Sequence, residues 1–174
     1  DDNTQYNNTK NGHVYINNST LSRITELANT TRVENAAYYT EKETLTYIFE
    51  YLPYIDADII RILEPAVGTG NIIPFLVKKY SYAQELIIDV IDIDEDALII
   101  AEKLWRTHDF PDNVQINIIH ADYLQMNLGD RFYNLIIGNP PYIKIPASRE
   151  LNNYREQFNN YSANNLAAFF LEKS

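Results

Sequence analysis

From residue 57 onward, short apolar runs alternate with stretches that have the apolar spacing of amphipathic helices. Four runs predict β-strands, at residues 58–65, 85–94, 114–122 and 132–139. Helical patterns lie near 71–80 and at 95–105, 150–160 and 165–173. The strands are apolar enough to be covered on both faces, and strands that alternate with helices usually pair in parallel. The pattern predicts an α/β fold with a doubly wound, mostly parallel sheet.

The residues before this alternation have a different character. Residues 1–18 are polar and rich in Asn, which indicates a flexible lead-in. Apolar residues at helical spacing predict a helix over 19–32, and a stronger helix is expected from residue 40 onward. Thr40 can cap that second helix, Glu43 follows three residues later, and Pro53 ends it.

Composition narrows the class of protein. The 174 residues suffice for one domain, and 45% are hydrophobic and 22% charged, as in soluble globular proteins. No apolar stretch approaches the length of a membrane span. Without cysteine, and with three scattered histidines, we expect no disulfide and no metal site, and a cytoplasmic location. The first residue is not Met and the last segment has no stop signal, so we expect a piece of a longer protein.

Net charge gives a weak argument about partners. A formal charge of −10 argues mildly against nucleic acid, since phosphate binding usually needs a basic face. The excess of acidic residues lies before Pro140, however. After Pro140 the chain has four basic residues and three acidic ones.

Candidate site residues follow the ends of the strands, where open α/β sheets bind their ligands. Glycines between Glu64 and Gly70 allow a tight turn and close approach of a ligand, although a plain strand-to-helix turn explains them equally well. Asp92 is placed to accept hydrogen bonds from ribose hydroxyls, with Ile93 against a base, while Asp94 can be the N-cap of the next helix.

The third strand ends in a similar polar group. Asp122 could accept a hydrogen bond from an exocyclic amino group, and Tyr123 could line a purine pocket. His120 has no partner at the spacing of a metal ligand, so we interpret it as structural.

The fourth strand is followed by Asn139-Pro140-Pro141-Tyr142. Proline fixes its own φ and restrains the residue before it, so the segment is stiff. It offers two fixed acceptors, the side-chain oxygen of Asn139 and the carbonyl of Pro140, and Tyr142 offers a flat ring for stacking. This arrangement suits a planar group that carries an NH₂. Hydrogen bonds from both N–H groups to the two acceptors localise the nitrogen lone pair, so that the nitrogen can attack an electrophile. A merely structural Pro-Pro turn rarely needs these flanking residues.

The segments "ILEPAVGTGN", "VIDIDEDAL", "IIHADYL" and "LIIGNPPY" resemble, in order and spacing, the S-adenosylmethionine-dependent adenine-N6 DNA methyltransferases of bacterial restriction–modification systems. "AAYYTEKE" resembles the additional cofactor motif of the gamma group, and "NLAAFFLEK" the helix after the catalytic strand. The resemblance implies a Rossmann-like methyltransferase sheet, here truncated after its fourth strand. It divides the chain into a lead-in with a helix at 1–35 and an incomplete catalytic domain at 36–174.

The resemblance also implies residue roles. The methionine end of the cofactor would lie against Tyr39, Thr40 and the loop that includes Glu64, Pro65, Ala66, Gly68 and Gly70. Asp92 would bind the ribose hydroxyls, Ile93 would pack on the adenine, and Asp122 would bind the adenine amino group beside Tyr123. Phe170 would line the cofactor pocket, with Phe169 as the alternative in the same run. A target adenine, flipped out of double-stranded DNA, would be held by Asn139, Pro140, Pro141 and Tyr142.

The chain is shorter than members of that family, which continue with three more strands and a target-recognition domain. The family's strand order would leave the fourth strand at the edge of the sheet. We therefore expect this chain to bind S-adenosylmethionine without selecting a DNA site. Three alternatives stay open: a protein-glutamine N5 methyltransferase acting on release factors, an rRNA amino-methyltransferase, and a non-catalytic scaffold that only binds the cofactor.

Overall fold

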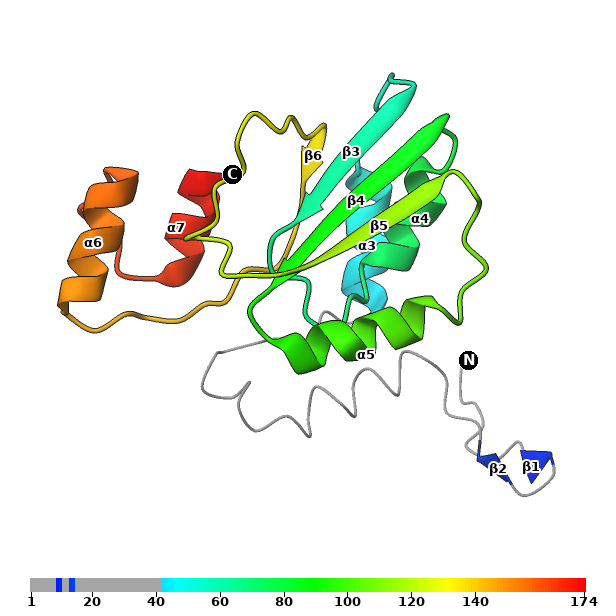
Figure 1. The fold of residues 1–174 in the computed structure, drawn as a ribbon, viewed down its shortest axis with the longest axis horizontal. Helices are drawn as coiled ribbons and strands as arrows, with labels where there is room; N and C mark the ends of the chain where they lie inside the picture. The colour runs from blue at the N-terminus through cyan, green and yellow to red at the C-terminus, as the bar shows by residue number, and fades with distance from the viewer. Residues whose placement is uncertain (1–8, 11–12, 15–41) are drawn as a thin grey trace.

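The computed structural model describes residues 9–10, 13–14 and 42–174 (Figure 1). Two short strands, β1 (Thr9–Lys10) and β2 (His13–Val14), form an antiparallel pair within the segment predicted to be a flexible lead-in. The helix expected at 19–32 and the Thr40 cap lie outside the described residues. The main body follows in the order α3 (Lys42–Tyr51), β3 (Ile59–Glu64), α4 (Ile73–Tyr80), β4 (Glu85–Asp92), α5 (Glu95–Trp105), β5 (Val114–His120), β6 (Leu135–Ile136), α6 (Arg149–Phe158) and α7 (Leu166–Lys173).

The main sheet has the strand order β5-β4-β3-β6, and every pairing in it is parallel. This confirms the parallel α/β class, with β6 at one edge of the described sheet. The predicted strand over 132–139 is wrong in its length, because only Leu135 and Ile136 of β6 pair with β3. The chain leaves the sheet at Gly138, and the two prolines that follow lack the N–H groups that a longer ladder would need.

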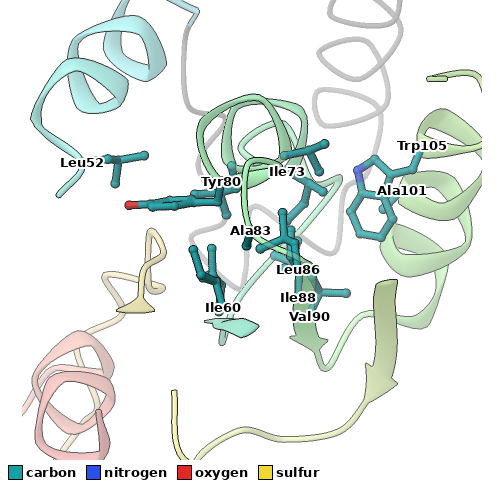
Figure 2. Packing of buried hydrophobic residues seen from close by; sticks show 14 of the residues in the cluster. Leu52, Ile60, Ile73, Tyr80, Ala83, Leu86, Ile88, Val90, Ala101 and Trp105 are labelled. Atoms are coloured by element: carbon teal, nitrogen blue, oxygen red, sulfur yellow. The ribbon is translucent and has the colours of Figure 1, made fainter. Parts of the chain in front are cut away.

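One face of the sheet is covered by α3, α4 and α5. Alternate residues of β3 and β4, such as Ile60, Ile62 and Ile88, are fully buried against Leu76 of α4 and its neighbours. Figure 2 shows this cluster, with Trp105 of α5 at one end and Leu52 at the other. Each fully buried aliphatic side chain contributes about 1.5–3 kcal/mol, so this face supplies much of the stability of the domain.

The other face is covered only in part by helices. Near the carboxyl ends of the strands, Leu63 and Ile91 pack in a cluster with Phe169 of α7 and Leu151 of α6. The two helices lie together on one side of the sheet (Figure 1). They therefore cover the half of this face that is nearest to the strand ends.

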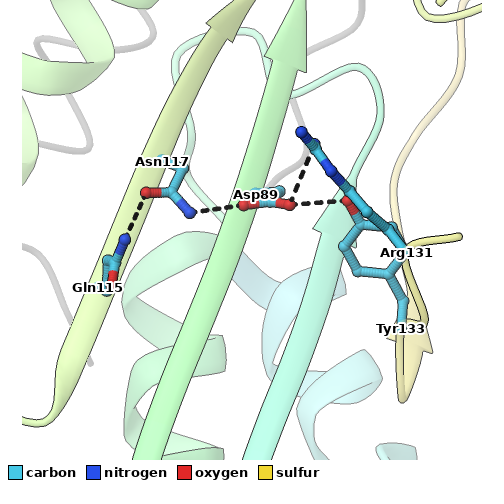
Figure 3. A network of polar contacts seen from close by, with 5 residues as sticks. All are labelled: Asp89, Gln115, Asn117, Arg131 and Tyr133. Atoms are coloured by element: carbon cyan, nitrogen blue, oxygen red, sulfur yellow. Dashed lines mark hydrogen bonds and ion pairs between the residues drawn. The ribbon is translucent and has the colours of Figure 1, made fainter. Parts of the chain in front are cut away.

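A polar network occupies the same face around Asp89, in the middle of β4 (Figure 3). The carboxylate of Asp89 accepts hydrogen bonds from Asn117 Nδ2 and Tyr133 OH, each at 2.7 Å, and lies 3.8 Å from Arg131 Nη1. Gln115 in turn donates to Asn117 at 2.8 Å. β4 is buried on both faces, as predicted, but on this face it includes one carboxylate, which is satisfied by polar neighbours.

Helix boundaries agree with their sequence signals. Asp94 is the N-cap of α5, and its side chain accepts a hydrogen bond from Ala97 N, as predicted. Tyr51 ends α3 two residues before Pro53. Among the described residues, no helix is long and apolar enough to cross a membrane.

Candidate functional site

A cavity of about 750 Å³ lies beyond the carboxyl ends of β3, β4 and β5. It is bounded by the loops that follow these strands, by the segment after β6, and by Tyr154 of α6 and Phe170 of α7. Most of the candidate residues that the sequence indicates line it: Glu64, Pro65, Ala66, Gly68, Asp92, Ile93, Asp122, Tyr123, Asn139, Pro141, Tyr142 and Phe170. The candidates at the ends of strands, from Glu64 to Tyr142, therefore line one cavity although they lie up to 78 positions apart in the sequence.

The glycine loop after β3 is held by a carboxylate from the next strand. Gly68 has φ 54°, in the left-handed region that glycine adopts readily. Its N–H donates to Asp92 Oδ2 at 2.7 Å, and Asp92 Oδ1 accepts from Asp94 N at 2.9 Å. Asp92 thus fixes the loop beside the cavity, a role that its position in the sequence did not reveal.

Gly70 does not line the cavity. It has φ 74°, and a Cβ at this position would overlap the indole ring of Trp105. The Trp105 Nε1–H also donates to the carbonyl of Gly70 at 3.2 Å. Gly70 therefore serves the packing of the loop against α5, and Trp105 is a supporting residue that the motif did not indicate.

Glu64, the last residue of β3, is a buried acid in the wall of the cavity. Its side chain is 2% exposed, and Oε1 accepts a hydrogen bond from Ala66 N at 3.2 Å. Burial raises the pKa of Glu64 to about 8, and the nearby carboxylate of Asp92 acts in the same direction. Glu64 is therefore mostly protonated at neutral pH in this structure, which strand-end position alone could not predict.

The loops after β4 and β5 place apolar surface beside carboxylates. Ile93 is 63% exposed where it borders the cavity, next to Asp92. Asp122 borders it after β5, and its Oδ1 accepts from Leu124 N at 2.9 Å. The rings of Tyr123 and Phe170 lie 5.1 Å apart at their centroids. His120 Nε2 lies 3.0 Å from the carbonyl of Ile93, which fits the structural role predicted for it.

The segment after β6 forms the opposite wall. Asn139 is exposed at the cavity, and its side chain has no hydrogen bond to any part of the chain that the structure describes. Tyr142 is 56% exposed there. Pro140 does not line the cavity, and Tyr39 and Thr40 lie outside the described residues.

Residues beyond the motif complete this wall, and sequence reasoning missed them. Ile145 N donates to Asn164 O at 2.7 Å, and Leu166 N donates to Ile143 O at 2.9 Å. These bonds tie the stretch after Tyr142 to the start of α7. The only sequence signal for them is the apolar alternation of "YIKIP".

The cavity has no group of side chains suited to a metal ion. Within residues 42–174 and the two short strands, no three His, Cys, Asp or Glu side chains come together at a distance that could hold one. Asp92 and Asp122 each lie beside backbone N–H groups at the ends of different strands, so they are suited to separate polar groups of an organic ligand.

Comparison with known proteins assigns the family. A family model described as Eco57I restriction-modification methylase matches residues 75–174, more than half of the chain. The chain belongs to this family. The matched range contains Asp92, Asp122 and the Asn139–Tyr142 segment.

Two curated relatives support this membership. A bifunctional methyltransferase of Rickettsia bellii is 36% identical over 91 residues, which are 52% of this chain and 15% of that protein. The modification methylase CviBIII of Paramecium bursaria Chlorella virus NC1A is 26% identical over 117 residues, 67% of this chain and 28% of that protein. The chain spans less than a third of the length of either relative.

The fold agrees with solved structures of the same class. A protein of Listeria monocytogenes described as a class I S-adenosylmethionine-dependent methyltransferase superposes with a TM-score of 0.60. The match covers 91% of this chain and 50% of that one at 16% sequence identity, so it establishes the fold. The chain therefore has the Rossmann-like parallel sheet of class I methyltransferases.

Proposed function

We propose that this chain forms the cofactor-binding and amino-group-binding part of a DNA methyltransferase that transfers a methyl group from S-adenosylmethionine to N6 of adenine. The observation that carries the proposal is the meeting of Asp92, Asp122 and the Asn139–Tyr142 segment on one cavity. Membership of a restriction-modification methylase family favours DNA as the substrate over protein or ribosomal RNA.

The chemistry of the cavity fits the cofactor. Asp92 can accept from the ribose hydroxyls, and Asp122 can accept from the adenine amino group. Glu64 can meet the ammonium group of the methionine part once its own proton has left. Ile93, Tyr123 and Phe170 supply apolar surface for the adenine. A cavity of about 750 Å³ lies within the roughly 300–1,000 Å³ range of small-molecule sites.

When bound, S-adenosylmethionine supplies an electrophilic methyl group on its sulfonium. The chain's own task is to present an amino nitrogen to that group. The Asn139 side-chain oxygen borders the cavity and can accept a hydrogen bond from one N–H of the target amino group. The carbonyl of Pro140, which does not itself border the cavity, is the proposed acceptor for the other N–H, and the two bonds together localise the nitrogen lone pair. Tyr142 can stack on the ring. The proton can leave after attack, so no strong base is required at the start.

The test uses the protein at its natural length with S-adenosylmethionine labelled in its methyl group. Incubation with duplex DNA, with a glutamine-containing release-factor peptide and with ribosomal RNA separates the three substrate classes. The proposal predicts label in DNA, located on N6 of adenine. Label in the peptide or in RNA, with none in DNA, would assign a different substrate.

An Asn139→Ala variant tests the role of the motif in the same assay. Loss of one preorganised partner of the transition state usually reduces the rate by about 10²–10³-fold. A variant with the wild-type single-turnover rate would show that Asn139 is only a turn residue.

A further inference from the structure

The turn after β5 is held in place by the last helix. Within the turn, Met126 N donates to the carbonyl of Asp122 at 3.0 Å. Lys173, the last residue of α7, donates from Nζ to the carbonyls of Leu124 at 3.0 Å and Met126 at 2.5 Å. Gln157 of α6 adds a hydrogen bond from Nε2 to the Leu124 carbonyl at 3.0 Å. Two helices thus converge on the turn that begins with Asp122.

Lys173 also contacts the aromatic wall of the cavity. Its ammonium lies 5.1 Å from the centroid of the Tyr123 ring, within the range of a cation–π interaction. Burial lowers the pKa of Lys173, whereas the negative charge of Asp122 acts in the opposite direction. The lysine is therefore coupled to the two residues that follow β5 in the cavity wall, Asp122 and Tyr123.

A simple stabilising role for α7 does not account for these contacts. A lysine in the last turn of a helix commonly serves the carbonyls of its own helix. Lys173 instead directs its hydrogen bonds to a segment 47 and 49 residues earlier. The helix is already anchored by Phe169, which is fully buried, and by Phe170.

We propose that Lys173 is a positioning residue that fixes the turn bearing Asp122, so that its carboxylate is held to recognise the amino group of the cofactor's adenine. This inference rests on the proposed function, because it assigns Lys173 to the adenine end of that same site. Lys173 itself touches no cofactor atom in this account. It acts through the backbone of the turn and through the ring of Tyr123.

The test compares S-adenosylhomocysteine with S-inosylhomocysteine, in which a carbonyl replaces the 6-amino group and N1 carries a hydrogen. The affinity of each is measured by calorimetric titration of the full 174-residue chain. The variants are Lys173→Met, which removes the donors, and Lys173→Arg, which retains a cation and donors. Lys103→Met is the matched control, because Lys103 is an exposed lysine in the last turn of α5.

The wild-type chain and the Lys103→Met control should prefer the adenine ligand by about tenfold or more, the value of a hydrogen bond to a carboxylate. Asp122→Ala, which lacks the carboxylate acceptor, serves as the reference for a lost preference. Lys173→Met should show a preference close to that of Asp122→Ala, and Lys173→Arg should keep most of the wild-type preference. The ratio of two affinities on the same folded population does not depend on how stable the variant is. This separates positioning from a general loss of structure.

An unchanged preference in Lys173→Met would overturn the positioning role while leaving the proposed function intact. Equal loss in Lys173→Arg and Lys173→Met would also overturn it, since the role requires donors at this position. If the wild-type chain binds neither ligand, the cofactor site itself is refuted and the positioning role with it.

Discussion

Gly138 lies so close to the Glu64 carboxyl group that no side chain fits between them. A Cβ at Gly138 would overlap Glu64 Oε1 and would lie 3.0 Å from Cδ of the same side chain and 3.2 Å from Pro65 Cδ. The Asn139–Tyr142 segment, which we propose holds the target amino group, therefore begins beside a glycine that rests directly on the buried acid Glu64. This contact joins the two walls of the cavity.

Gly138→Ala should displace Asn139 and lower the thermal stability of the chain. The overlap forces a shift, and such overpacking typically costs about 1–3 kcal/mol. In the Glu64→Ala background the cost should shrink, because the overlapping atom is gone. Thermal unfolding of the wild-type chain, the two single variants and the double variant measures the cost of Gly138→Ala in each background. Equal costs in the two backgrounds would mean that Gly138 is required for a reason other than this contact.

Glu64→Gln should remove a pH dependence of stability. The pKa of Glu64 is about 8 in the folded chain and near 4.5 when unfolded. Because the folded value is raised, the stability contributed by the protonated group is complete below about pH 4.5 and is lost as pH rises toward 8. Over that range the wild-type unfolding free energy should fall, relative to Glu64→Gln, by about 1.4 kcal/mol per pH unit.

Denaturant titrations of both proteins at pH 5, 6, 7 and 8 measure this difference directly. Other titrating groups are common to the two proteins and largely cancel. A constant difference across the series would show that Glu64 is ionised in the folded chain throughout.

Trp105→Phe should weaken the glycine loop. The substitution removes the N–H that donates to the Gly70 carbonyl, and an unsatisfied buried acceptor costs about 1–3 kcal/mol. Trp105 is also the one tryptophan of the sequence, so its fluorescence should respond when a ligand orders the loop. Thermal unfolding of the variant and a fluorescence titration of the wild-type chain measure the two effects. Unchanged stability would show that the indole N–H does not hold the loop.

Asp92→Ala should reduce both cofactor affinity and stability. The loss of stability is expected because the Asp92 side chain accepts hydrogen bonds from Gly68 N and Asp94 N. The loss of affinity is expected because the same side chain borders the cavity. Affinity for S-adenosylhomocysteine should fall by roughly tenfold or more, because hydrogen bonds to a charged group are each worth about 1.5–3 kcal/mol. Asp96→Ala, an exposed acid in the first turn of α5, is the control. Unchanged affinity in Asp92→Ala would remove this residue from the binding site.

The elements were predictable wherever local signals determine them. The spacing of apolar residues and the Asp94 cap predicted α5 at 95–105 without error. The strand after residue 132 was predicted too long, because its apolar run continues past the point where pairing with β3 ends. Asp89 was overlooked because a carboxylate inside a strand is satisfied only by residues from other parts of the chain, among them Asn117 and Tyr133.

The candidate site shows the same contrast between local sequence signals and contacts made by distant parts of the chain. The meeting of Asp92, Asp122 and Asn139 on one cavity was predictable because each lies at or just after the end of a strand, and parallel strands bring their carboxyl ends to one edge. Lys173 and Trp105 were not predictable, since their partners lie 49 and 35 residues away and no local pattern marks them. The raised pKa of Glu64 depends on burial by Gly138 and the loop, which only the folded chain provides.

The central claim is that one cavity binds the cofactor through Asp92 and receives the target amino group through Asn139. Calorimetric titration of S-adenosylhomocysteine into the wild-type chain, Asp92→Ala and Asn139→Ala tests it most directly. The account predicts binding with one site per chain, an affinity reduced by about tenfold or more in Asp92→Ala, and nearly wild-type affinity in Asn139→Ala. The absence of binding to the wild-type chain, or equal losses in the two variants, would contradict it.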